Sequence, residues 1–124
     1  MANEAKPLFR PGAEVTALAT ADVTGKTFVG VSATRGTDGL VKVAPATAAA
    51  KPFGVAAYDA ASGKRLPIHR GGIIPVTAGG SIAAGAEVEV GTGGKVVTKA
   101  SGVSVGLALE TGTSGNDVLV ALDI

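Results

Sequence analysis

The sequence contains one match to a nucleophile motif of hydrolases, at Gly102-Val103-Ser104-Val105-Gly106. In enzymes with this G-x-S-x-G pattern, a sharp turn between a strand and a helix exposes the serine oxygen for attack. Around Ser104, however, the residues alternate as in an unbroken strand, and no helix is predicted after it. The single histidine, His69, would also have to act as the general base. We therefore interpret the motif as a chance match in a chain rich in Gly, Ser and Val.

Two glycine-containing segments are partial matches to nucleotide-binding loops. Gly25-Lys26-Thr27 has the end of the phosphate-binding pattern G-x-x-x-x-G-K-[ST], but Thr20 replaces its first glycine. Gly91-Thr92-Gly93 begins like the dinucleotide pattern G-x-G-x-x-G, but Val96 stands where the third glycine belongs. Neither segment lies between a predicted strand and a predicted helix. Both are therefore expected to be turns.

The remaining chemically able side chains are two acids and the histidine. Glu87 and Glu89 share one face of a predicted strand, and paired carboxylates can perform acid–base chemistry on sugars. No aromatic residue nearby could seat a sugar, so a solvated strand face is expected. His69 is expected on the surface or at an interface, and one His without any Cys makes a poor metal site. The sequence thus predicts no enzyme, no cofactor and no bound metal.

The elements that would position these residues are almost all strands. From Glu14 onward, short alternating segments are separated by glycine-rich turns at spacings near ten residues. This pattern predicts an all-β fold, a small barrel or sandwich with little helix. In the clearest segments, 103–109 and 118–124, one face of each strand is expected to be buried. Those faces consist of Val103, Val105, Leu107 and Leu109, and of Val118, Val120, Leu122 and Ile124.

Three local features refine this pattern. The glycine-rich segment 91–94 predicts a hairpin loop. Pro67 and Pro75 lie inside strand-like segments and are expected on edge strands or at bulges, because proline lacks an amide hydrogen. Only 47–50 and 80–84 are expected to allow a short helical turn.

Composition excludes several classes of partner. The net charge is +1 and 17% of residues are charged, so no basic surface is available for nucleic acid. The absence of Cys excludes disulfides. The longest uncharged segment, 71–86, is too short to cross a bilayer, and charged residues and Pro7 interrupt any apolar signal-peptide region at the start. We expect no nucleic-acid, membrane or small-molecule partner.

The chain divides into two predicted parts. Residues 1–12 contain two prolines around Leu8 and Phe9 and show no strand or helix period, which predicts an extended N-terminal arm that docks on a partner. Residues 13–124 are predicted to form a single β domain. This domain has many small residues, with 19 Gly in the whole chain, and few aromatic side chains, so further burial is expected between subunits.

An ordered series of segments carries a family resemblance. It consists of Pro52-Phe53-Gly54-Val55-Ala56-Ala57-Tyr58-Asp59-Ala60, then Gly63, Leu66 to Arg70, Gly71-Gly72 and Ile73 to Val76. A Gly-Val-Ala-x-x-Asp-Ala strand, a turn, a strand ending in a basic residue and glycine, and a further strand resemble the small head-decoration, or capsid-cementing, proteins of tailed bacteriophages, including the lambda type. Segments 78–90, 94–101 and 103–110 are similar to the decoration proteins of actinobacterial phages.

This resemblance implies a fold, a location and a partner. It implies a β-clip-like or β-tulip-like fold and a homotrimer on the outer surface of the virion capsid. There the trimer would bind the major capsid protein after the shell expands and clamp neighbouring subunits against the pressure of packaged DNA. The arm would add to this contact by β-augmentation. The expected capsid-contact residues are Lys6, Pro7, Leu8, Phe9 and Arg10, with Leu8 and Phe9 as apolar anchors.

Two other functions stay open from the sequence. The first is a different virion or surface β-module, such as a glycan-binding or fibre-associated domain, which glycan binding would reveal. The second is a trimeric β-fold nucleotide hydrolase, which would require turnover of nucleotides by the pure protein. Fold analogy alone is poor evidence for the hydrolase.

Overall fold

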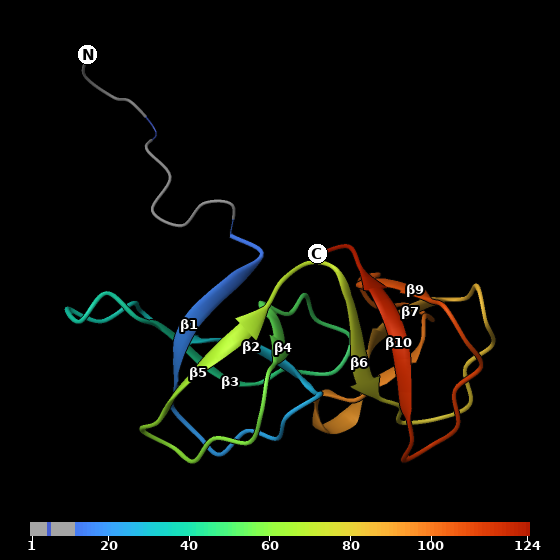
Figure 1. Cartoon of the computed structure of the whole chain (residues 1–124), viewed down its shortest axis with the longest axis horizontal. Coiled ribbons are helices and arrows are strands. Elements are labelled where there is room, and N and C mark those ends of the chain that lie inside the picture. The colour runs from blue at the N-terminus through green and yellow to red at the C-terminus, as the bar shows by residue number, and fades with distance from the viewer. Residues whose placement is uncertain (1–4, 6–11) are drawn as a thin grey trace.

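Ten strands and one short 3-10 turn form the regular structure of the computed structural model, which describes residue 5 and residues 12–124 (Figure 1). In chain order they are β1 (Glu14–Ala19), β2 (Phe28–Ala33), β3 (Val41–Pro45), β4 (Gly54–Ala56), β5 (Arg65–His69), β6 (Ile73–Thr77), β7 (Glu87–Val90), the turn η1 (Thr92–Gly94), β8 (Val96–Thr98), β9 (Gly106–Ala108) and β10 (Asp117–Leu122). The predicted all-β class with little helix is confirmed.

The first five strands close into a barrel with the order β1-β3-β2-β4-β5. β1 runs parallel to β3 and antiparallel to β5, with Glu14 opposite His69 and Leu18 opposite Arg65. Closure leaves no strand edge free for pairing with another chain. Alanines 17 and 19 point inward from β1 and are fully buried, and such small side chains suit the interior of so small a barrel.

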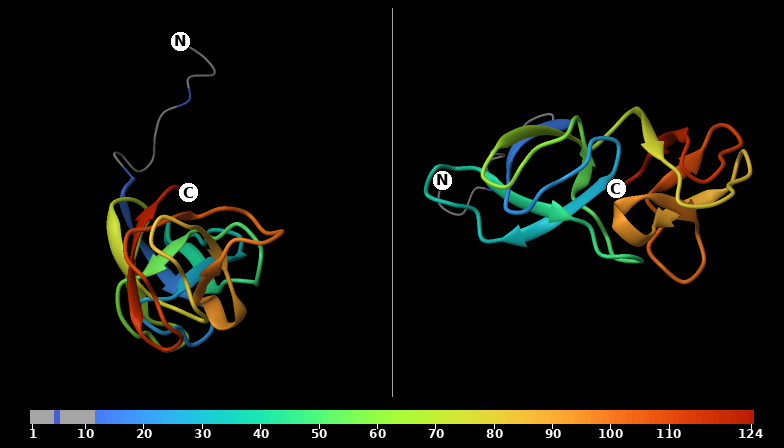
Figure 2. Two further views of the ribbon diagram at one scale, coloured as in Figure 1. Left: turned by 90° about the vertical axis from the view of Figure 1, so that its right-hand side faces the viewer. Right: turned by 90° about the horizontal axis from the view of Figure 1, so that it is seen from below.

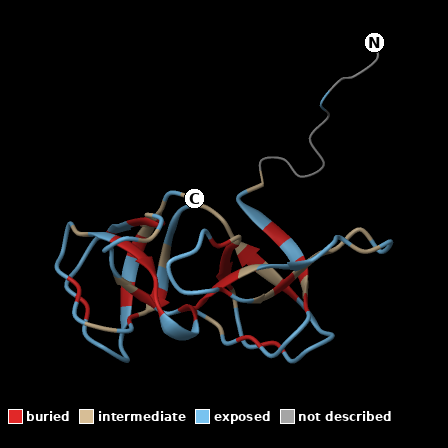
Figure 3. Cartoon of the chain, turned by 180° about the vertical axis from the view of Figure 1, so that it is seen from behind, coloured by how far each residue is buried: buried red, intermediate tan, exposed pale blue. Residues whose placement is uncertain are grey.

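The last five strands form a second sheet with the order β6-β10-β9-β7-β8. Seen from below, it lies beside the barrel along the long axis of the molecule (Figure 2). The two parts share a core, because Phe28, Ala46 and Val55 of the barrel pack with the inner face of the second sheet. Figure 3 shows buried residues within each part and where the parts meet.

The two prolines lie in different kinds of strand. β6 is an edge strand, so the prediction for Pro75 is confirmed. The prediction for Pro67 is wrong, because β5 pairs on both sides within the closed barrel and shows no bulge. The carbonyl oxygen of Pro67 accepts a hydrogen bond from the amide of Ala57, just beyond the end of β4. Pro67 has no amide hydrogen to return a second bond, so the pairing with β4 stops there.

The 3-10 turn lies where no helix was expected. It forms the loop of the predicted β7–β8 hairpin, with Gly93 at φ 72°. In contrast, neither 47–50 nor 80–84 forms a helical turn, and Ala49 instead has φ 65° in a tight turn. The expectation for these two segments is therefore wrong.

The two clearest predicted strands differ in outcome. In β10, Val118 and Val120 are buried as predicted, and Leu122 packs against the core. The alternation expected over 103–109 is wrong. Val105 is buried, but Val103, Leu107 and Leu109 are 44%, 41% and 43% exposed, and Ala108 points into the core instead. The switch occurs at Gly106, whose φ of 153° and close contact with β10 interrupt the strand.

Candidate interaction surfaces

The hydrolase-like motif does not form a nucleophile turn. Ser104 lies in an irregular segment before β9, and no helix follows it in the described part of the chain. The expected unbroken strand through the motif is therefore wrong, although the interpretation as a chance match agrees with this geometry. His69 belongs to the barrel, where its Nδ1 lies 3.6 Å from Oε2 of Glu14 on β1. The histidine thus lies in the barrel, whereas the serine lies in the irregular segment before β9.

Among residue 5 and residues 12–124, no group of three or more His, Cys, Asp or Glu side chains is placed to hold a metal ion. The same residues include no helix of the length and apolar character that a membrane span requires.

A concavity of about 650 Å³, which we call the Lys26 groove, lies where the barrel meets the second sheet. Nζ of Lys26 is 2.7 Å from Oδ2 of Asp117 on β10, and the carbonyl oxygen of Lys26 accepts a hydrogen bond from the amide of Thr77 on β6. Lys26 adopts φ 63°, a conformation that costs a residue with a side chain about 1 kcal/mol. Tyr58 and Asp59 also line the groove, and the Asp59 carboxylate accepts a hydrogen bond from the amide of Gly25. The contacts among the residues that line the groove therefore connect the two parts of the molecule.

Acid should weaken this junction. The hydrogen bond and positive charge of Lys26, with a smaller effect of Thr77, lower the pKa of Asp117. A carboxyl whose pKa is lower in the folded state stabilises that state above its unfolded pKa of about 4, and this stabilisation is lost as the pH falls through the folded pKa. Both side chains are about half exposed, so we expect less than about 1 kcal/mol.

The measurement is the free energy of urea unfolding of the wild type and of Asp117→Asn at pH 7 and pH 3. The difference between the two proteins should be present at pH 7, become smaller at pH 3, and shrink in high salt. An equal difference at both pH values would contradict the role assigned to the ion pair.

The two acids of β7 differ in their surroundings. Glu87 is exposed, but Glu89 is only 6% exposed, so the prediction of a solvated face is wrong for Glu89. Its carboxylate accepts hydrogen bonds from the amides of Ala100 and Gly102, which cover it. A Cβ at position 102 would overlap the carboxylate, so only glycine fits there. Glu89 thus fixes the segment that leads into β9.

Replacing Glu89 with alanine should lower the free energy of unfolding by about 2 kcal/mol, because two amides lose their acceptor in a buried place. Glu89→Gln keeps an acceptor oxygen and should lose less. Urea unfolding measures the stability, and hydrogen exchange at Ala100 and Gly102 reports the local opening. Equal losses in the alanine and glutamine variants would show that the carboxylate oxygen does not hold this segment.

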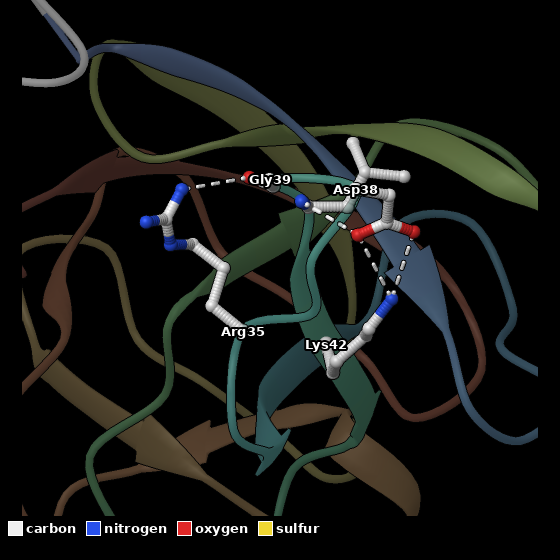
Figure 4. Close-up of polar contacts among 5 residues, drawn as sticks. Arg35, Asp38, Gly39 and Lys42 are labelled. Carbon is white, nitrogen blue, oxygen red and sulfur yellow. Dashed lines mark hydrogen bonds and ion pairs between the residues drawn. The ribbon is translucent and has the colours of Figure 1, made fainter.

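The loop between β2 and β3 projects from the barrel, away from the second sheet (Figure 1). It is held by its own polar contacts (Figure 4): the Asp38 carboxylate accepts from the amide of Leu40 and pairs with Lys42 at 3.1 Å, and Arg35 donates to the carbonyl of Gly39. The amide of Leu40, followed by Lys42, lowers the pKa of Asp38. These contacts hold the exposed loop in one conformation.

A second concavity, of about 350 Å³, lies on the barrel beside the start of β1, and we call it the Arg70 groove. The amide of Arg70 donates to the carbonyl of Ala13, and its guanidinium lies 4.6 Å from the centre of the Phe53 ring. Nε of Arg70 also donates to the carbonyl of Phe53. The groove is mostly apolar, with Val31 64% exposed, and Lys51 also lines it. The predicted contact residues Lys6, Pro7, Leu8, Phe9 and Arg10 lie outside the described residues.

The outer face of the second sheet is also apolar, and we call it the outer apolar face. On it, Leu107 lies opposite Ala121, which in turn lies opposite Ile73. In the next row, Leu119 lies opposite Pro75 and accepts a hydrogen bond from the amide of Leu109. Four of these side chains are large and exposed, with Ile73 at 60% and Leu119 at 38%. Contiguous apolar patches of this kind typically mark sites of protein association.

Sequence reasoning missed both apolar surfaces. The sequence hides the outer apolar face because its alternation predicts that Leu107 and Leu109 lie in the core. The Arg70 groove combines a strand, a loop and the end of the barrel, which no local pattern brings together. The signals were Gly106, whose missing side chain marks the change of face, and Pro52-Phe53, an apolar pair at the start of a very short strand.

Comparison with known proteins identifies the kind of molecule that carries these surfaces. No curated protein sequence matches the chain. The crystal structure of the N-terminal base of the head fiber protein gp8.5 from bacteriophage phi29 has a similar fold, with a TM-score of 0.74 and 24% sequence identity over 89% of this chain and 92% of that chain. A family model described as phage cement protein matches residues 9–124. The chain therefore belongs to the phage cement protein family.

Proposed function

We propose that this protein cements the phage capsid as a homotrimer, binding the major capsid protein on the expanded shell and stabilising it against the pressure of packaged DNA. Membership of the family makes the chain a structural protein of the virion, located on the outside of the capsid. The observation that carries the proposal is the family match over residues 9–124. The lambda-like or actinobacteriophage type stays a prediction.

The described surfaces support a role in binding rather than in catalysis. A closed barrel and a second sheet with a shared core form a stiff body. This body presents a preorganised loop, two grooves and an apolar sheet face, and it needs no small-molecule substrate or cofactor for the proposed role. Three linked copies of weak contacts would bind neighbouring capsid subunits with avidity.

Co-sedimentation with purified phage heads tests the proposal. The protein should pellet with expanded, empty heads and much less with unexpanded ones, and decorated heads should survive heating that breaks bare heads. Sedimentation equilibrium of the protein alone measures its oligomeric state. A protein that ignores expanded heads would contradict the proposed cementing function, whatever its oligomeric state.

We further propose that residues 1–12 form an arm, distinct from the β domain of residues 13–124, and that Lys6, Pro7, Leu8, Phe9 and Arg10 contact the capsid. Ala13, where this arm begins, pairs with the end of β5 at the barrel surface. An arm leaving from there is free to add a strand to a capsid sheet, with Leu8 and Phe9 as apolar anchors.

Deletion of residues 1–12 should weaken binding to expanded heads at least about tenfold, because the anchors and their backbone hydrogen bonds are lost. The double variant Leu8→Ser/Phe9→Ser should reproduce most of this loss. The matched control, Asn3→Ser/Glu4→Gln, changes the same region without touching the anchors and should bind normally. Unchanged binding of the truncated chain, measured by co-sedimentation, would rule out the arm as a capsid contact.

One observation favours glycan binding as a second candidate function. Tyr58 is 53% exposed in the Lys26 groove, which Asp59 and Thr77 also line. An aromatic face with neighbouring hydrogen-bonding groups is the usual composition of a sugar site. A glycan array with the wild type and Tyr58→Ala tests it: competable binding that the substitution abolishes would support this function.

A further inference from the structure

The charges of the molecule are divided between its two parts. Residues 12–72, which contain the barrel, include seven Lys and Arg against four Asp and Glu. Residues 73–124, which contain the second sheet, include two Lys against five Asp and Glu. One end of the elongated molecule is therefore net positive and the other net negative. Such an arrangement favours contact between unlike ends of neighbouring copies.

The same division holds around the two apolar surfaces. The outer apolar face is bordered by exposed acids, with Glu87 opposite Leu107 and Glu110 directly after Leu109. Two basic side chains, those of Lys51 and Arg70, line the Arg70 groove. Each surface thus combines an apolar centre with a charged rim, and the two rims have opposite signs. This is the composition expected of two halves of one interface.

Symmetry gives an independent reason to pair unlike surfaces. A patch that meets its own copy across a twofold axis produces a closed dimer. A ring of three subunits is instead built from a contact between two different patches of each subunit. If the protein is a trimer, the outer apolar face needs a partner patch elsewhere on the molecule. The Arg70 groove is apolar, concave and oppositely charged, and it therefore fits this requirement.

We propose that the outer apolar face of each subunit packs against the Arg70 groove of the next copy of this chain, closing a three-membered ring. This contact rests on the proposed homotrimer and assigns its surfaces. Leu107 and Leu119 fill the apolar centre from one side, and Val31 and Phe53 from the other. Glu87 and Glu110 face the basic rim of Lys51 and Arg70. The head-to-tail contact thus buries the leucines that the isolated chain leaves exposed.

Two variants disable one side of the contact each. Leu107→Ser/Leu119→Ser removes the apolar centre of the sheet face, and Val31→Ser/Lys51→Glu alters the groove and its rim. All four side chains are exposed, so the folded chain should survive, which circular dichroism and thermal unfolding check. The matched control is Leu18→Ser, a leucine at the outer side of β1 beside Lys42 and Arg65, outside both surfaces.

Sedimentation equilibrium of the full-length chain gives the decisive readout. The wild type and Leu18→Ser should be trimers, whereas each double variant should be a monomer at concentrations up to about 100-fold above those at which the wild type assembles. A mixture of the two double variants should form dimers, because one keeps an intact groove and the other an intact sheet face. A contact between like surfaces cannot produce that complementation.

The other outcomes overturn the inference in distinguishable ways. If the Leu107→Ser/Leu119→Ser protein is still a trimer, the outer apolar face takes no part in the contact between subunits. If this trimer has also lost binding to heads, the face contacts the capsid. Failure of the mixture to associate excludes the head-to-tail pairing. A monomeric wild type overturns both the contact and the trimer. Co-sedimentation with expanded heads then decides separately whether the cementing function stands.

Discussion

Replacement of Phe28 with alanine is expected to lower the free energy of unfolding by about 3–5 kcal/mol, a large share of the 5–15 kcal/mol typical of a domain. Phe28 is the largest fully buried side chain, and it reaches from β2 of the barrel into the core of the second sheet. Alanine would leave a cavity where the two parts meet. Urea unfolding below the concentration of assembly measures the loss.

Phe53→Ala is the matched control for this prediction. Phe53 has the same side chain, but it is only partly buried and packs at the edge of the barrel core. Its replacement should cost clearly less than that of Phe28. An equal loss would mean that the junction between barrel and sheet adds nothing beyond ordinary burial. A larger loss of unfolding free energy for Phe28→Ala, together with two separate unfolding steps, would instead show that Phe28 couples the two parts.

Replacement of Gly106 with alanine should cost about 3 kcal/mol or more. A Cβ at this position would overlap the backbone carbonyl of Ala121 and lie close to Val120, and neither the strand nor its partner can yield easily. The φ of 153° adds strain for any residue with a side chain. The shift would separate β9 from β10 and disturb the outer apolar face.

Gly115→Ala separates these two causes. Gly115 also has a positive φ, of 85°, but nothing lies within 4 Å of a Cβ built there. Gly115→Ala should therefore lower the free energy of unfolding by only about 1 kcal/mol, because glycine tolerates this backbone conformation better than alanine. Urea unfolding of both variants gives the comparison. Similar losses at the two positions would show that overlap with Ala121 does not matter and that the strands adjust.

The fold was predictable where burial follows the alternation of residues. β1, β5 and β10 each bury every second residue, so the apolar pattern gives both the strand and its inner face. The apolar pattern fails over 103–109. Large and small residues alternate there, and this alternation does not by itself show which of the two faces is buried. There the close approach of Gly106 to β10 decides, and that contact involves a segment not adjacent in sequence. The position of Pro67 in a strand paired on both sides could not be predicted for a similar reason, because the pairing of β5 with β1 joins segments far apart in sequence.

The candidate surfaces were less predictable than the fold. Lys26 and Asp117 are 91 positions apart, and no local pattern relates them. Glu89 looks like any exposed acid in its strand, and only the covering amides of Ala100 and Gly102 make it a buried anchor. The family resemblance predicted the location of the protein on the virion. The surfaces themselves depend on contacts between segments that only the folded chain brings together.

The closure of the barrel has a consequence for how fast the chain folds. β1 pairs with β3 and β5 but with no strand adjacent to it in sequence, so Glu14 must find His69 before the barrel is complete. Chains dominated by such distant pairings fold in milliseconds to seconds, because loop closure must precede the contacts that reward it. Once closed, the barrel has no free edge from which strands can peel away. Slow opening, measured as a half-life, would suit a protein on the outside of the capsid.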